Sequence, residues 1–124
     1  MSCSMTIDAV RDRTKTVTRR HVDTWQGLEP GDRLTLIEKG MGLAKGAKQV
    51  VLCEVVIVDV RTETLRAMAH EVDACDREGF PGYSRTDFAR MWARSHGYRS
   101  WSEFDLLEIP CRRIEWRYLE ATDG

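Results

Sequence analysis

The chain lacks the features that identify several large classes of protein. No apolar run among its 124 residues is long enough to cross a membrane, and the amino end has no apolar signal-peptide region. The four cysteines form no Cys-x-x-Cys pair, and the three histidines show no metal-ligand spacing. We therefore expect a cytosolic protein with free thiols, no membrane partner, no cofactor and no metal. The alternative is a zinc site that uses Cys75, His70 or His96.

An excess of positive charge is also missing. The 19 lysines and arginines are balanced by 20 aspartates and glutamates, which leaves a net charge of -1. This balance argues against a protein that coats nucleic acid through bulk charge, so anion binding needs a local cluster of cations. Such a cluster is present, because lysines and arginines are dense between Arg11 and Arg20.

No Pro- or Ser-rich linker, repeat or low-complexity tract divides the chain. At this length we expect a single domain over residues 1–124, and a hydrophobic content of 42% is enough for a core. Nothing in the sequence indicates an oligomeric state.

Alternating and β-branched residues predict strands over 33–39, 49–60 and 112–119. The segment 49–60 is nearly all Val, Leu and Ile and should be central in a sheet. Residues 14–20 are expected to be extended or a turn, and residues 21–32 a loop. Residues 39–48, with three glycines, are expected to form an exposed loop between two strands.

Helices are expected over 5–12, 62–68 and 71–78, and from Ser84 to near Gly97. Ser84 and Asp87 imitate a capping box at the start of the last of these helices. Gly79 should end the helix expected over 71–78. The sum is an α+β domain whose mostly antiparallel sheet is interrupted by a helical insertion. Small sheets of this kind often curl into a barrel to hide their edges.

The most informative segment is basic and rich in hydroxyl groups. It is the octet Arg13-Thr14-Lys15-Thr16-Val17-Thr18-Arg19-Arg20. In an extended chain, Thr16 and Thr18 share one face while Lys15 lies on the other. A helical turn would instead bring Lys15 beside Thr18. A lysine beside a threonine is a possible base–nucleophile pair, and a lysine beside two arginines is a possible anion site.

Lys15 therefore has three interpretations. It is a catalytic base if burial or a neighbouring cation lowers its pKa, and otherwise a clamp for phosphate or carbonyl oxygen, or a solvated surface lysine. Arg19 and Arg20 alternate in direction if the segment is extended, so only one of them should face a cleft. Trp25, in a polar loop, is either a partly buried cap or a stacking platform for a base.

Together with later motifs, the octet resembles the opening of the ASCH (activating-signal-cointegrator homology) family. In chain order, the other matching motifs are Trp25, Leu28-x-Pro30-Gly31-Asp32, Glu38-Lys39-Gly40-Met41-Gly42-Leu43, the strand to Val60, Glu78-Gly79-Phe80 and Arg113-Ile114-Glu115-Trp116. The likeness covers residues 5–119 and looks closest to the small stand-alone ASCH proteins of bacteria and their phages.

The resemblance implies a PUA-like fold, which is a small β-barrel with helices packed around a cleft that binds RNA or a modified nucleoside. Family members include small amidohydrolases that remove acyl groups from acetylated cytidine, and at least one ribonuclease. The amidohydrolases use a lysine, a threonine and a glutamate, which by motif fall on Lys15, Thr18 and Glu78. The competitors for the place of the glutamate are Glu71, Asp73 and Asp76.

Three functions remain open at this point. The first is a binding module for RNA or a nucleoside, whose expected ligand contacts are Arg13, Thr16, Arg19, Arg20 and Trp25. The second is an amidohydrolase that uses the Lys15, Thr18 and Glu78 set. The third is a metal-independent ribonuclease in which Lys15 and an arginine stabilise the phosphorane charge. The near-neutral net charge favours a small ligand or a short contact over long RNA.

Overall fold

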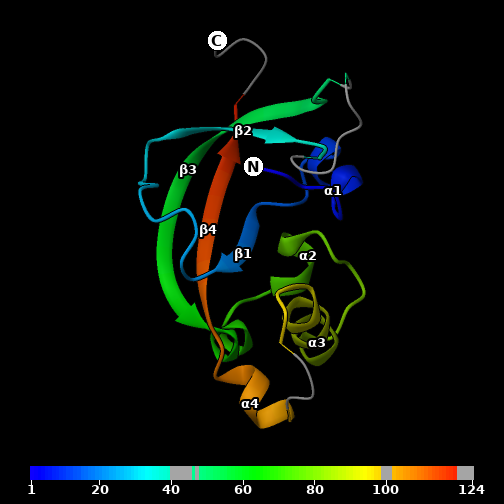
Figure 1. The fold of residues 1–124 in the computed structure, drawn as a ribbon, viewed down its shortest axis with the longest axis vertical. Coiled ribbons are helices and arrows are strands. Elements are labelled where there is room, and N and C mark those ends of the chain that lie inside the picture. Colours follow the sequence, from blue (N-terminus) through cyan, green and yellow to red (C-terminus); the bar gives the residue numbers. More distant parts are fainter. Residues whose placement is uncertain (40–45, 47, 99–101, 120–124) are drawn as a thin grey trace.

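The described strands form one curled antiparallel sheet. The computed structural model of the chain describes residues 1–39, 46, 48–98 and 102–119, apart from the side chains of residues 103 and 104. The strands follow the order β1-β4-β3-β2, and all three pairings are antiparallel (Figure 1). Their bounds are β1 Val17–His21, β2 Arg33–Ile37, β3 Val51–Thr64 and β4 Pro110–Tyr118. The α+β class and the antiparallel sheet that the sequence predicts are confirmed.

The strand β3 is longer than predicted. Its last residues, Thr62 to Thr64, pair with Arg112 to Pro110 of β4, and this cross-strand pairing keeps the chain extended. The helix that the sequence predicts over 62–68 is therefore wrong for its first three residues, and residues 65–68 are helical. A 3-10 helix, η1 (Leu65–His70), starts only after the pairing ends. The loop predicted over 39–48 lies mostly outside the described residues.

Of the described α-helices, α3 is the longest. Their bounds are α1 Ile7–Arg11, α2 Ala74–Glu78, α3 Arg85–Ser95 and α4 Glu103–Leu107. α3 begins where the capping motif predicts, because the Ser84 hydroxyl accepts a hydrogen bond of 3.0 Å from the backbone N–H of Asp87. α4 lies between α3 and β4, in a stretch where the sequence predicts no helix or strand. No described helix has the length and apolar character needed to span a bilayer.

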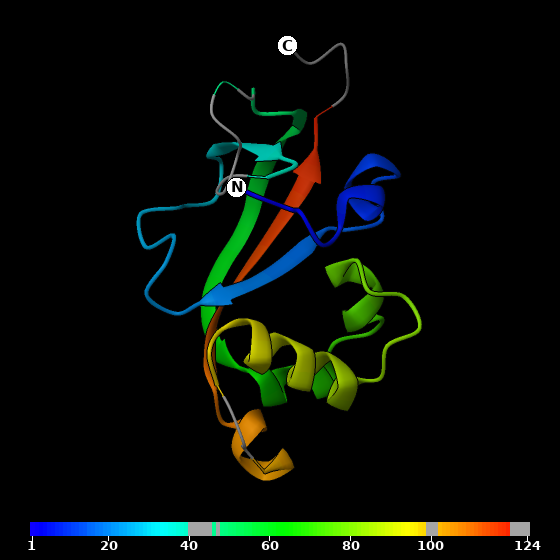
Figure 2. The ribbon, with the colours of Figure 1, turned by 45° about the vertical axis from the view of Figure 1, so that its right-hand side comes forward.

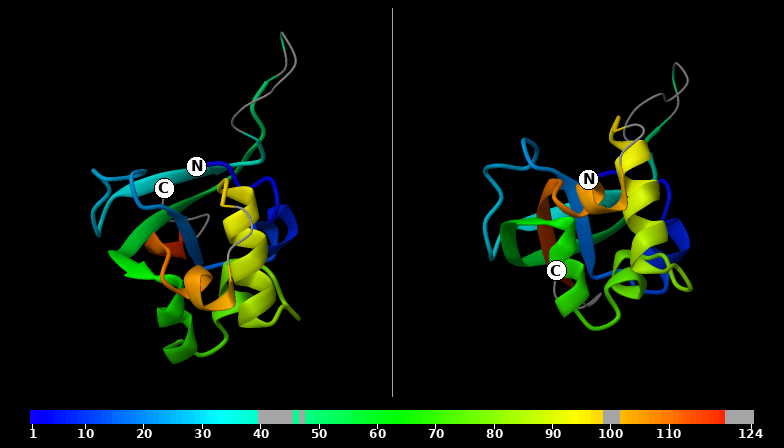
Figure 3. Two further views of the ribbon diagram at one scale, coloured as in Figure 1. Left: turned by 60° about the horizontal axis from the view of Figure 1, so that its bottom comes forward. Right: turned by 90° about the horizontal axis from the view of Figure 1, so that it is seen from below.

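The core has two parts, one inside the curl of the sheet and one among the helices. The sheet cluster includes Leu36, Val55, Ile57, Ile114 and Trp116. The helix cluster packs α3 against η1 and α4 and includes Leu65, Met68, Phe88, Trp92 and Ile109. Figure 2 and Figure 3 show η1, α2, α3 and α4 gathered beside one end of the sheet, and Figure 2 shows α1 nearer the other end. Several buried polar side chains belong to neither cluster, and these are Thr6, Lys15, Thr18, Arg19, Glu78 and Arg113.

Different groups cover the two edges of the sheet. On β1, the N–H of Arg19 donates to the Glu78 carboxylate at 3.3 Å, and the carbonyl of Arg19 accepts from the Trp92 indole at 2.7 Å. On β2, residues 1–3 run alongside Ile37 and form backbone hydrogen bonds of 2.9 Å with it. Both edges are thereby closed at these points to pairing with a further strand.

Candidate functional site

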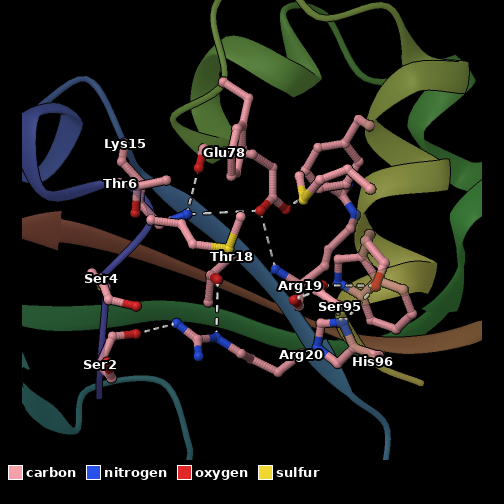
Figure 4. A pocket seen from close by; sticks show the side chains of 16 residues that line it. Ser2, Ser4, Thr6, Lys15, Thr18, Arg19, Arg20, Glu78, Ser95 and His96 are labelled. Atoms are coloured by element: carbon pink, nitrogen blue, oxygen red, sulfur yellow. Dashed lines mark hydrogen bonds and ion pairs between the residues drawn. The ribbon is translucent and has the colours of Figure 1, made fainter. Parts of the chain in front are cut away.

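A cavity lies between the amino-terminal segment, β1, α2 and α3 (Figure 4). Its volume is about 160 Å³, and an apolar cavity of roughly 150 Å³ in a protein core holds a benzene ring. A six-membered ring therefore fits. Its deep end is formed by the buried residues Cys3, Lys15, Thr18, Glu78, Phe88 and Trp92. Its mouth is formed by the partly or fully exposed residues Ser2, Ser4, Met5, Arg20, Ser95 and His96.

Lys15 lies just before β1, where its backbone is held by three hydrogen bonds. Its N–H donates to the carbonyl of Ala9 at 3.0 Å, and its own carbonyl accepts from the Trp116 indole at 3.1 Å and from the Tyr118 hydroxyl. Residues 14–16 are neither strand nor helix. Because the regular strand starts only after them, Lys15 and Thr18 line the same cavity.

The amino group of Lys15 is removed from bulk water. Lys15 is 2% exposed, and its Nζ donates to the backbone carbonyl of Glu78 and lies 3.7 Å from Oε1 of the same residue. Burial lowers the pKa of Lys15 below its ordinary value of 10.5, although the Glu78 carboxylate acts in the opposite direction. More of the lysine is therefore neutral at a given pH, and a neutral amine can accept a proton.

Thr18 faces the cavity from β1 and is tied to Arg20. The Thr18 hydroxyl oxygen accepts a hydrogen bond of 3.1 Å from Arg20 Nε, and Arg20 Nη2 donates to the carbonyl of Ser2 at 2.7 Å. An N–H donor at this oxygen would stabilise an alkoxide there, because hydrogen bonds to a charged form favour that form. Within the described part of the chain, no hydrogen bond joins Lys15 Nζ to the Thr18 hydroxyl.

Glu78 is the last residue of α2 and reaches the octet from 63 residues away. Gly79 follows it with a φ of 92°, and a Cβ there would lie 2.9 Å from Cγ2 of Thr6. Glycine is thus required both by the backbone angle and by the close packing of α2 on Thr6. This packing places the Glu78 carboxylate between two cations. Oε1 faces Lys15, and Oε2 accepts a hydrogen bond of 2.9 Å from Arg19 Nη1.

The Arg19 side chain extends away from the mouth into a buried ion network. Besides Glu78, its guanidinium contacts Glu71 at 3.2 Å and Glu63 at 3.4 Å. Burial opposes the charge, but the three carboxylates outweigh it and raise the pKa of Arg19. Glu71 also accepts a hydrogen bond of 2.7 Å from Arg113, the cross-strand neighbour of Arg19. Glu71 thereby separates two arginines that would otherwise repel one another.

The structure gathers five of the predicted site residues around the cavity, namely Lys15, Thr18, Arg19, Arg20 and Glu78. The other three lie elsewhere. The Arg13 guanidinium sits 5.7 Å from the centroid of the Tyr118 ring, and the Thr16 hydroxyl accepts a hydrogen bond of 3.2 Å from Arg77. Trp25 packs against the sheet cluster. The side chains of Arg19 and Arg20 diverge, as expected for an extended segment.

The wall that α3 contributes was not predicted. It consists of Phe88, Met91, Trp92, Ser95 and His96. These positions recur at helical spacing, so they form one stripe that is apolar at first and polar at its carboxyl end. That change of character along the stripe is the signal that could have identified the wall. Ser2 and Ser4 carry no comparable signal, because their place depends on the pairing of residues 1–3 with β2.

Among the described residues, no group of three or more His, Cys, Asp or Glu side chains is placed to hold a metal ion. The four cysteines are free. Comparisons with protein-family models, with curated proteins and with solved structures found no match for this chain.

Proposed function

We propose that the chain is an ASCH-type domain with a PUA-like fold that hydrolyses the amide of an acylated, cytidine-type nucleoside. One observation carries this proposal. A lysine whose pKa is lowered by burial lies in a ring-sized cavity with a threonine hydroxyl and a glutamate carboxylate. A simple anion clamp gains nothing from such burial, because the neutral amine that burial favours has no charge to offer an anion.

In the first step, neutral Lys15 accepts the hydroxyl proton of Thr18 while Oγ1 attacks the acyl carbonyl carbon. The carbonyl π bond opens, and its electron pair moves to the oxygen of a tetrahedral intermediate. Arg20 already donates to Thr18 Oγ1, so a fixed positive charge lies next to the reacting atoms. Glu78 stabilises the ammonium that the proton transfer creates.

In the second step, the carbon–nitrogen bond of the intermediate breaks, and Lys15 returns its proton to the leaving amine. The acyl group then remains on Thr18 as an ester. A water molecule attacks this ester with Lys15 again accepting a proton, which releases a carboxylic acid and restores the Thr18 hydroxyl. The sum is amide plus water giving amine plus acid, with no other reactant. Lys15 Nζ must leave the Glu78 carbonyl for this role, and catalytic hydrogen bonds commonly tighten only in the complex.

A second candidate is a nucleoside-binding module without catalysis. It is favoured by the hydrogen bonds of the free site, in which Lys15 Nζ donates to Glu78 and the Thr18 hydroxyl accepts from Arg20. Because these bonds hold both side chains in place, the deep end presents donors and acceptors at fixed positions to the edge of a base. The apolar side chains of α3 would then pack against the ring.

The two candidates separate on one assay, the release of cytidine from N4-acetylcytidine. We expect turnover by the unaltered protein, and a loss of about 10²–10⁴-fold in both Lys15→Met and Thr18→Ala. Thr16→Ala is the matched control, because Thr16 lies two positions away and outside the cavity lining. Full turnover in Thr18→Ala would discard the mechanism. Binding of the nucleoside without turnover by the unaltered protein would select the second candidate.

A further inference from the structure

The mouth of the cavity differs chemically from its deep end. The deep end holds a buried amine and a buried carboxylate, whereas the mouth carries neutral polar groups and one cation. These mouth groups are Ser2, Ser4, Ser95, His96 and Arg20. Arg20 already uses two of its nitrogens to bond Thr18 and Ser2. A set of this kind, rich in groups that donate and accept, suits a hydroxylated ligand better than an anion.

His96 is the mouth residue whose orientation is most firmly held. Its ring stacks on Trp92 with centroids 3.9 Å apart and an interplanar angle of 18°. Its Nδ1 lies 2.8 Å from the backbone carbonyl oxygen of Trp92, at the carboxyl end of α3 (Figure 4). Two independent contacts therefore fix both the plane of the ring and its rotation within that plane.

These contacts also determine which nitrogen of His96 carries the proton. Nδ1 also lies 3.2 Å from the Ser95 hydroxyl, but that hydroxyl donates its proton to the Trp92 carbonyl at 2.9 Å. A carbonyl oxygen can only accept, so the Nδ1 that faces it carries the N–H. Burial lowers the pKa of His96 below 6.5, although the hydrogen bond to the Trp92 carbonyl raises it. Arg20 and His21 act with burial and Glu78 opposes it, so the neutral ring dominates near pH 7. In the neutral ring with Nδ1 protonated, Nε2 is a hydrogen-bond acceptor.

We propose that His96 is a specificity-determining residue whose Nε2 accepts a hydrogen bond from a ribose hydroxyl of the bound nucleoside. The inference rests on the proposed function, which places the acylated base at the deep end beside Lys15 and Thr18. Because a cavity of about 160 Å³ is filled by one ring, the sugar must extend to the mouth. A phosphate oxygen there would face the lone pair of Nε2, whereas a hydroxyl can donate to it. The mouth is therefore a sugar subsite.

Equilibrium binding of cytosine and of cytidine tests this assignment without any need for catalysis. We expect the unaltered protein to bind cytidine about 3- to 10-fold more tightly than cytosine, the range of one hydrogen bond. His96→Phe keeps an aromatic ring to stack on Trp92 but has no acceptor, so it should bind both ligands equally, with the affinity for cytosine unchanged. His96→Gln should recover part of the preference, because an amide oxygen also accepts. His70→Phe, outside the cavity lining, is the matched control and should behave like the unaltered protein.

The outcomes distinguish this inference from the function on which it rests. If the unaltered protein binds neither cytosine nor cytidine, the proposed function and the sugar subsite both fall. If it binds both with equal affinity, or if His96→Phe keeps the full preference for cytidine, only the sugar subsite is overturned. The binding of cytidine 5′-monophosphate provides a further test. Tighter binding of this nucleotide than of cytidine, dependent on Arg20, would show that the mouth binds an anion and would overturn the assignment.

Discussion

Glu78 has a buried cation on each side, and the pKa values of the two cations are shifted in opposite directions. On the cavity side, Lys15 Nζ lies 3.7 Å from Oε1, and on the sheet side Arg19 Nη1 lies 2.9 Å from Oε2. Burial lowers the pKa of Lys15. The pKa of Arg19 is raised in spite of burial. One carboxylate thus separates a site suited to proton transfer from a site of permanent charge.

The difference follows from the number of carboxylates that each cation contacts. Arg19 reaches Glu63 and Glu71 as well as Glu78, and a guanidinium has enough N–H groups to bond all three. Among the carboxylates of the described residues, Lys15 is paired with the shared Glu78 alone, and at a longer distance. A buried charge with incomplete compensation contributes little to stability, so its presence points to function. Arg19 holds Glu78 in place, whereas Lys15 keeps a lowered pKa and gives up its proton more readily.

The largest expected effect on stability comes from removing the sheet-side cation. Arg19→Met fills a similar volume but leaves buried Glu78 without its 2.9 Å partner. It also takes one of their cations from the partly buried Glu63 and Glu71. We expect the free energy of unfolding to fall by about 3–5 kcal/mol, measured by urea denaturation with tryptophan fluorescence as the signal. A loss below about 1 kcal/mol would mean that the two sides of Glu78 do not differ in the way described.

A smaller loss is expected when the carboxylate between the two arginines is neutralised. Glu71→Gln leaves the cross-strand pair Arg19 and Arg113 with weakened compensation, and we expect a loss of about 1–3 kcal/mol near pH 7. Burial favours the neutral acid, but Arg19 and Arg113 outweigh it and lower the pKa of Glu71 below 4.5. The stabilisation is therefore present above pH 4.5 and is lost as the pH falls through the folded-state pKa. The free energies of unfolding of the unaltered protein and of Glu71→Gln should converge between pH 7 and pH 3. A difference that stays constant over this range would contradict this account.

Removing the cavity-side cation should change stability little. Lys15→Met eliminates a desolvated charge but leaves the Glu78 carbonyl without its donor, and we expect a net change within about 1 kcal/mol at pH 7. In the unfolded chain the lysine keeps its proton up to about its ordinary pKa of 10.5, whereas buried Lys15 releases it at a lower pH. The unfolded state then binds more protons, so the stability of the unaltered protein should rise with pH relative to Lys15→Met. Parallel urea titrations from pH 7 to pH 10 would check this, and a relative fall would reverse the assigned sign.

The smallest effect is expected at an exposed ion pair. Arg66 Nη2 lies 2.6 Å from Glu108 Oε1, but about half of each side chain is exposed to water. We expect Arg66→Ala to cost less than about 1 kcal/mol, with a further reduction at high salt. This variant calibrates the denaturation series. A loss as large as that of Arg19→Met would show that burial is not what gives the sheet-side network its importance.

The local parts of the fold could be predicted because their causes lie close together in the chain. Ser84 caps α3 through the N–H of Asp87, and Gly79 ends α2 with the positive φ that glycine allows. The predicted start of the helix over 62–68 was wrong for the opposite reason, and the helix begins at Leu65. Thr62 to Thr64 are held extended by residues 110–112 of β4, and no local pattern reports a partner so distant in the sequence.

The same division applies to the candidate site. Lys15, Thr18 and Arg20 are close in sequence, and their spacing identified them as a possible pair and anion site before any geometry was known. Glu78 was assigned only through a family resemblance, and the structure places it beside Lys15. From the sequence, His96 was named only as an alternative zinc ligand, because the role proposed for it depends on a stack with Trp92 and on the position of α3 against the amino-terminal segment.

The amino-acid sequence by itself determined the α+β class, the cap of α3 and the glycine that ends α2. It also brought a lysine, hydroxyls and arginines together in one octet. Only the tertiary structure decided that Lys15 is under-compensated while Arg19 is surrounded by carboxylates. The physical reason is that propensity and capping act between neighbours in the chain, whereas desolvation and charge pairing depend on which distant residues the fold places within a few ångströms of a group.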